Sequence, residues 1–202
     1  MKSASLVISL LAAGCATAPT VSSVDQDRDT VVVYSATDSR SPMYKQGENR
    51  DVRGSLEKLE RQAEENGRDV KLWVSIAQLK LIQNDFDGAM LAARKALAID
   101  TKRSEATLVL AKVAYRKGNL DAAELHLNGL GGINAKNSEV HNLMALINLA
   151  RGDETSANAL FLQGLKLNSN DIAIRANLGM ALLARKQVNS AALQFERVLA
   201  VV

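Results

Sequence analysis

The sequence holds one cysteine, Cys15, so no disulfide can form within the chain. Its two prolines, Pro19 and Pro42, lie near the start, which leaves residues 43–202 without the residue that most often breaks a helix. Aromatic residues make up 3% of the chain and hydrophobic residues 47%, a balance that favours helices rich in alanine and leucine over a sheet. The net charge of +3 comes from interleaved acids and bases, so the sequence has no basic patch that predicts nucleic-acid binding.

Residues 70–202 repeat with a period of 34. Two positions in the period carry small residues and two carry mostly larger apolar ones, in register across four copies. The four series are Ala77, Ala111, Ala145 and Gly179; Ala89, Ala123, Ala157 and Ala191; Ile76, Leu110, Met144 and Leu178; and Ala93, Leu127, Phe161 and Phe195. This register predicts an array of structural repeats.

Each copy is long enough for two helices of about 12 to 14 residues and two short turns. In the second copy, Ser104 followed by Glu105 predicts an N-cap, and Gly118 is expected to adopt the left-handed conformation that ends the first helix. Ala111 and Ala123 should then face each other, because small residues let two helices approach closely.

On these residues the chain resembles the tetratricopeptide repeat family. The matching positions are Trp73, Ile76, Ala77, Ala89 and Ala96; Leu110, Ala111, Ala123 and Leu127; Met144, Ala145, Gly152, Ala157 and Phe161; and Leu178, Gly179, Ala191 and Phe195. The family's closing proline is replaced by Thr101, Ala135 and Ser169, and its opening aromatic survives only as Trp73. The resemblance implies an all-α fold, a right-handed α-solenoid with repeats at 70–103, 104–137, 138–171 and 172–202.

The first residues, MKSASLVISLLAAGC, combine an early lysine with a short apolar run, which is typical of a secretory signal and too short for a permanent membrane span. The segment from Leu11 to Cys15 resembles the lipobox of bacterial lipoproteins. That resemblance implies a signal peptide at 1–14, lipidation of Cys15, and, with Ala16 following the cysteine, an address in the outer membrane facing the periplasm. The alternative is an ordinary cleaved signal with an incidental cysteine.

Residues 15–50 are polar and without helical period, so we interpret them as a disordered tether behind the lipidated cysteine. Within them Val31 to Tyr34 is prone to form a strand, either as a sticky spot in a linker or as a strand added to a partner's sheet. Residues 51–69 predict an N-terminal capping helix, the lone second helix of a degenerate repeat. At the other end no polar helix follows Val202, which predicts a longer natural chain, a covering partner or self-association there.

Residues that could carry chemistry are few. His126 and His141 fall in different predicted helices, without further ligands at helical spacing, so we expect no metal site and no cofactor. We therefore predict that the protein is not an enzyme.

Stacked helical hairpins instead present a surface formed by the first helix of each pair. The resemblance places on that surface a mixed and then increasingly apolar set of side chains, which predicts a groove for an amphipathic helix or an extended peptide. The predicted groove residues are Val74, Gln78, Leu108, Lys112, Tyr115, Asn142, Leu146, Leu149, Met180 and Leu183. The alternative for the apolar members is burial between repeats.

Lipid anchor, tether and groove together predict a lipoprotein scaffold that binds an envelope protein. The layout resembles the TadD proteins of tight-adherence pili and the pilotins of type IV pilus secretins, which implies a secretin or another pilus-assembly component as partner. The alternative is a scaffold for peptidoglycan enzymes or outer-membrane assembly.

Overall fold

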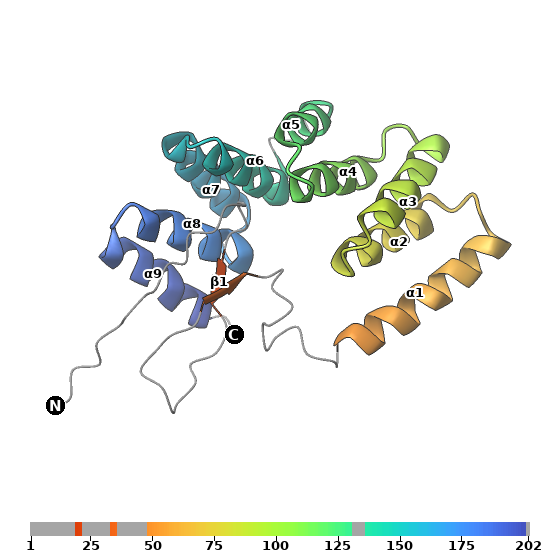
Figure 1. The fold of residues 1–202 in the computed structure, drawn as a ribbon, viewed down its shortest axis with the longest axis horizontal. Coiled ribbons are helices and arrows are strands. Elements are labelled where there is room, and N and C mark those ends of the chain that lie inside the picture. The colour runs from red at the N-terminus through yellow and green to blue at the C-terminus, as the bar shows by residue number, and fades with distance from the viewer. Residues whose placement is uncertain (1–18, 22–32, 36–47, 131–135, 201–202) are drawn as a thin grey trace. The chain divides into compact units, whose positions relative to one another are not determined.

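The fold is known from a computed structural model that describes residues 19–21, 33–35, 48–130 and 136–200 (Figure 1). The predicted signal peptide, Cys15 and Val202 lie outside the described residues. The chain divides into two compact units, one formed by residues 47–170 and one formed by residues 1–46 together with 171–202. Of the helices in the described ranges, none combines the length and the apolar character needed to cross a bilayer.

The unit of residues 47–170 consists of helices joined mostly by short turns. They are α1 (Glu48–Glu65), α2 (Val70–Ile82), α3 (Phe86–Ile99), α4 (Ser104–Arg116), α5 (Leu120–Asn128), α6 (Ser138–Ala150) and α7 (Glu154–Leu167). Three hairpins form where α2 packs against α3, α4 against α5, and α6 against α7. The first helices of these hairpins start 34 residues apart, and so do the second helices.

The helix boundaries are set by capping residues that recur with the same period. Asp85, Asn119 and Asp153 are N-caps. Each side chain accepts a hydrogen bond from the backbone N–H three residues later, which satisfies a donor at the helix start. The N-cap of α4 is Arg103, and it makes no side-chain cap bond; the prediction of Ser104 as this N-cap is therefore wrong by one residue. Gly118 adopts φ +76°, as predicted.

Small residues at the hairpin contacts bring the helices together. Ala77, Ala89 and Ala93 are fully buried where α2 meets α3, and the same is true of Ala111 and Ala123 where α4 meets α5. In the third hairpin Ala145 and Ala157 are fully buried in the same way, and so is the larger Phe161, which stands at the repeat position of Ala93. The core of this unit thus combines alanines at close helix approaches with buried leucine, isoleucine and valine side chains.

The N-terminal helix α1 extends the array by one element. Leu56 and Ala63 are buried, and Leu59 packs against the same hydrophobic cluster as the residues of α2. The helix starts at Glu48, three residues before the predicted start at 51, and ends at Glu65. It contacts α2 as α3 contacts α4, which is the arrangement expected of a second helix preceding a first helix.

Ion pairs between hairpins also follow the period. Lys117 at the end of α4 lies 2.6 Å from Asp87 of α3, and Arg151 at the end of α6 lies 2.7 Å from Asp121 of α5. Arg151 also contacts Glu124 at 2.7 Å, and hydrogen bonds to Glu124 and then Asp121 raise the pKa of its guanidinium. Each pair fastens the end of a first helix to the preceding second helix.

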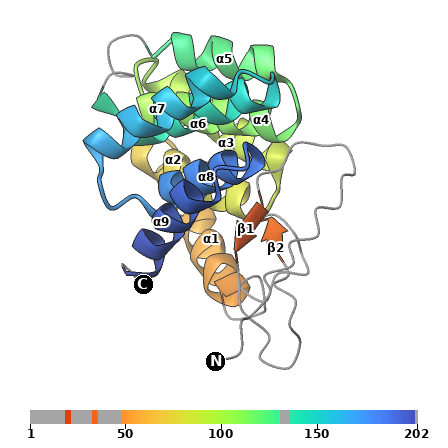
Figure 2. The ribbon, with the colours of Figure 1, turned by 90° about the vertical axis from the view of Figure 1, so that its left-hand side faces the viewer.

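The described residues of the other unit form one hairpin and one pair of short strands (Figure 2). Helices α8 (Ile172–Ala184) and α9 (Val188–Leu199) pack against each other, with Gly179 beneath the ring of Phe195. Strands β1 (Pro19–Val21) and β2 (Val33–Ser35) pair antiparallel, and β1 contacts α8. The predicted tether therefore differs from the structure at these two segments, and the strand-prone run at Val31 to Tyr34 overlaps β2, whose partner is β1.

Candidate functional site

The predicted groove residues of α2 and α4 divide into core and surface. Val74 and Leu108 are each only 5% exposed, and each belongs to one of two hydrophobic clusters of their unit. For these two residues the structure therefore favours the alternative, burial within the array, over the predicted contact with a ligand. Gln78, one turn after Val74, is exposed as predicted.

The remaining predicted residues of this unit are partly exposed on α4 and α6. They are Lys112, Tyr115, Asn142, Leu146 and Leu149. We call these five residues the repeat surface. It lies on the first helices of two successive hairpins, so the array positions it through the contacts that hold α4 against α6.

Polar contacts fix one end of the repeat surface. The ammonium group of Lys112 pairs with the carboxylate of Glu139 and joins α4 to the first turn of α6. Asn137 caps that turn by accepting backbone N–H groups from Glu139 at 2.9 Å and Val140 at 3.4 Å. Tyr115 packs against the core with part of its ring, and this burial raises the pKa of its hydroxyl.

The other end of the repeat surface is apolar. Leu146 and Leu149 are partly exposed on α6. A surface with partly exposed leucines at one end and an ion pair at the other is suited to binding a peptide that presents both apolar and charged side chains. Met180 and Leu183 lie partly exposed on α8, within the other unit.

The two histidines lie on different helices, and each is at least half-buried. His141 is 9% exposed, and its Nδ1 lies 2.9 Å from the backbone oxygen of Asn137. His126 is half-buried on α5, where burial and then the charge of Arg94 lower the pKa of its imidazole. Within the described part of the chain, no three histidine, cysteine, aspartate or glutamate side chains gather as metal ligands would.

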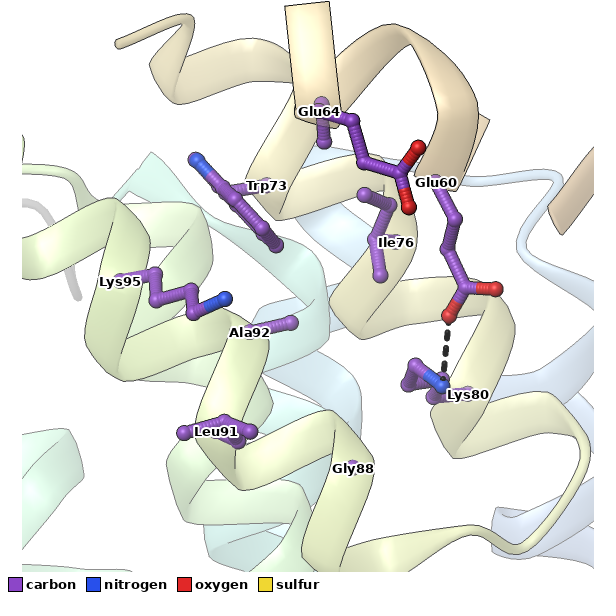
Figure 3. A pocket seen from close by; sticks show the side chains of 10 residues that line it. Glu60, Glu64, Trp73, Ile76, Lys80, Gly88, Leu91, Ala92 and Lys95 are labelled. Atoms are coloured by element: carbon purple, nitrogen blue, oxygen red, sulfur yellow. Dashed lines mark ion pairs between the residues drawn. The ribbon is translucent and has the colours of Figure 1, made fainter. Parts of the chain in front are cut away.

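A cavity that the sequence did not predict lies between α1, α2 and α3 (Figure 3). Its volume is about 460 Å³. Ala63, Ile76 and Ala92 form a buried apolar floor, Trp73 stands at one side, and Leu91 lies at the opening with 59% of its surface exposed. The one sequence feature that could have indicated this cavity is Leu91, an apolar residue on the polar side of its helix.

Comparison with known proteins identifies the repeats. Residues 80–147, from the end of α2 into α6, match the family model described as tetratricopeptide repeat. No curated protein sequence matches the chain.

Solved structures of repeat proteins share the fold. TTC0263, a thermophilic TPR protein of Thermus thermophilus, superposes with a TM-score of 0.68 at 22% identity, over 75% of this chain and 83% of its own. PilF of Pseudomonas aeruginosa gives a TM-score of 0.60 at 18% identity, over 74% and 70%. YrrB, described as a TPR protein with an unusual peptide-binding site, gives 0.54 at 21% identity, over 72% and 75%. The predicted all-α solenoid of tetratricopeptide repeats is thereby confirmed.

Proposed function

We propose that this protein is a non-catalytic scaffold of the outer membrane that binds an envelope protein through its repeat surface and acts in pilus or secretin assembly. A fold of tetratricopeptide repeats supports protein interaction, because its stacked helices present exposed faces to which another protein can bind. The lipid anchor, the membrane address and the pilus role are parts of the proposal.

The observation that carries the binding role is the partial exposure of Leu146 and Leu149. Both are partly exposed apolar side chains on α6. At the other end of the repeat surface, Lys112 is paired with Glu139, so the surface offers a ligand both apolar and charged groups. Apolar area at such a site supplies affinity, and the fixed charges supply orientation.

Two further observations support the envelope context. The segment that ends in Cys15 resembles a lipobox. PilF of Pseudomonas aeruginosa, whose name associates it with pili, has the same fold. At 18% identity this likeness concerns the fold, so the secretin or other pilus-assembly component remains a proposed partner.

Site-specific photocrosslinking in living cells tests the proposed partner. A photoreactive residue at Leu146 should capture a secretin or another pilus-assembly component, and the same residue at Leu162, an exposed position on α7, serves as the matched control. Capture of a cell-wall hydrolase or synthase from Leu146 would instead support the alternative scaffold for peptidoglycan enzymes. Capture of the protein alone would assign these leucines to self-association.

The membrane anchor has its own test. Cys15→Ser should prevent incorporation of labelled palmitate and release the protein from the membrane fraction, because three acyl chains bury many methylene groups at about 0.8 kcal/mol each. Palmitate labelling that persists in this variant would contradict the anchor. The crosslinking result from Leu146 would still stand by itself.

A further inference from the structure

The cavity between α1, α2 and α3 lies apart from the repeat surface. Its walls come from the capping helix and the first hairpin, whereas the repeat surface belongs to α4 and α6. Along α3 the lining residues run from Gly88 to Lys95, which lie seven positions or about 10 Å of helix apart. A cleft two turns long, with a volume of about 460 Å³, has room for one or two large side chains of a partner.

The cavity is held open by contacts on both sides. The indole N–H of Trp73 donates to the backbone oxygen of Gly67 at 2.7 Å, which fixes the ring at the cavity wall. On the other side, the ammonium group of Lys80 pairs with Glu60 of α1 at 2.8 Å and with Asp85 at 3.4 Å. The hydrogen bond to Glu60 is the largest cause that raises the pKa of Lys80.

These contacts leave one acidic group available to a ligand. Lys80 and Glu60 neutralise each other, and the ammonium group of Lys95 lies 4.1 Å from the centre of the Trp73 ring as a cation–π contact. The carboxylate of Glu64 extends into the cavity from α1 (Figure 3) and has no ion-pair partner among the described residues. A basic group is its natural complement, and the apolar floor beside it favours an apolar neighbour.

We propose that this cavity is a second docking site, which binds an amphipathic segment of a partner protein. The segment inserts one bulky apolar side chain between Leu91 and Trp73 and places a lysine or arginine against Glu64. The exposed Leu91 at the opening supplies the apolar contact through which the segment enters. This docking site is independent of the function proposed for the repeat surface, because different helices form it.

Selection from a library of random 12-residue peptides displayed on phage tests the proposal on the full-length protein. The enriched peptides should share a bulky apolar residue three or four positions from a lysine or arginine. Synthetic copies without tryptophan should then change the emission of Trp73 in a saturable way, since Trp73 is the single tryptophan of the sequence and lies in the cavity wall.

Variants locate the binding. Leu91→Glu should weaken the selected peptides by about tenfold or more, as expected for loss of a central apolar contact. Leu125→Glu is the matched control, because Leu125 stands 34 residues later on α5, is 71% exposed and does not line the cavity. Glu64→Gln keeps the shape of the side chain and should remove the preference for basic residues, while Leu146→Glu on the repeat surface should leave binding unchanged.

Several outcomes would overturn the proposal. These are a selection that enriches no peptide, peptides that bind Leu91→Glu as well as the parent protein, or peptides that carry acidic instead of basic residues. Equal loss in Leu91→Glu and Leu125→Glu would also overturn it, because the effect would then not belong to the cavity. Circular dichroism of each variant separates these results from loss of folding.

Discussion

Gly179→Ala should destabilise the hairpin of α8 and α9 although it adds a better helix former. A Cβ atom at Gly179 would lie 2.7 Å from Cε1 and 2.8 Å from Cζ of Phe195, about 1 Å closer than carbon atoms pack in protein interiors. The aromatic ring must therefore move. Overpacking of this kind costs about 1 to 3 kcal/mol, whereas alanine in place of glycine in a helix interior gains about 1 kcal/mol. The net change in the free energy of unfolding is a loss of up to about 2 kcal/mol.

The effect of Gly179→Ala on the free energy of unfolding should change sign when the ring of Phe195 is removed. In a Phe195→Leu background the clash is relieved, so Gly179→Ala should stabilise the hairpin by about 1 kcal/mol through helix propensity alone. A double-mutant cycle isolates this coupling, because the cost of Phe195→Leu itself cancels. One repeat earlier, Ala145 already lies in a hairpin with the fully buried Phe161, and there Ala145→Gly should cost about 1 kcal/mol.

The assay must report on α8 and α9 locally, because repeat arrays do not always unfold as one cooperative unit. The emission of Trp73 reports on the first hairpin and is unsuitable. Native-state hydrogen exchange, followed by mass spectrometry of peptides that cover 172–199, gives the local opening free energy. Gly179→Ala that stabilises this hairpin in the parent background would refute the packing argument.

Three further substitutions test the remaining elements. Phe161→Ala should cost about 3 to 5 kcal/mol, because it empties a fully buried site between α6 and α7; a thermal midpoint close to that of the parent would contradict this. Lys186→Gly should stabilise the turn after α8 by about 1 kcal/mol in hydrogen exchange, since Lys186 holds φ +61° where Gly118 stands in the second repeat. Asp153 has a pKa below its ordinary value of 3.8, chiefly through hydrogen bonding with Ser156, so its stabilising effect is present above that pH and is lost as the pH falls through the lowered pKa. The difference in urea midpoint between the parent and Asp153→Ala should accordingly shrink from neutral pH to about pH 3, and a constant difference would be evidence against this account.

The period of 34 residues allowed the architecture to be predicted from the sequence, because it fixes which residues face each other in each hairpin. Ala111 and Ala123 are buried at their helix contact, and Gly118 has the expected left-handed φ. The helix starts were less certain from the sequence. Ser104 looks like an N-cap, yet α4 begins at Ser104 itself after Arg103, so the period marks the position of a cap more reliably than the residue type does.

The binding surface was less predictable than the fold. Val74 and Leu108 occupy first-helix positions that the family resemblance directs towards a ligand, but both are buried in hydrophobic clusters, whose extent depends on contacts between helices. Sequence spacing describes one helix face at a time. The α1–α3 cavity escaped prediction for the same reason, because Glu64, Leu91 and Trp73 come from three helices whose separation the period does not determine.

The two proposed surfaces should be separable by mutation, because each hairpin of the array contacts chiefly its neighbours in sequence. Leu91→Glu changes an exposed side chain of α3, and Leu146→Glu changes a partly exposed one of α6. Their effects on the two binding activities should therefore add in the double variant. If Leu146→Glu altered the emission of Trp73 or the affinity for peptides selected at the α1–α3 cavity, the two surfaces would be coupled through α4. The scaffold would then bind its partners cooperatively, and neither surface could be assigned a function by itself.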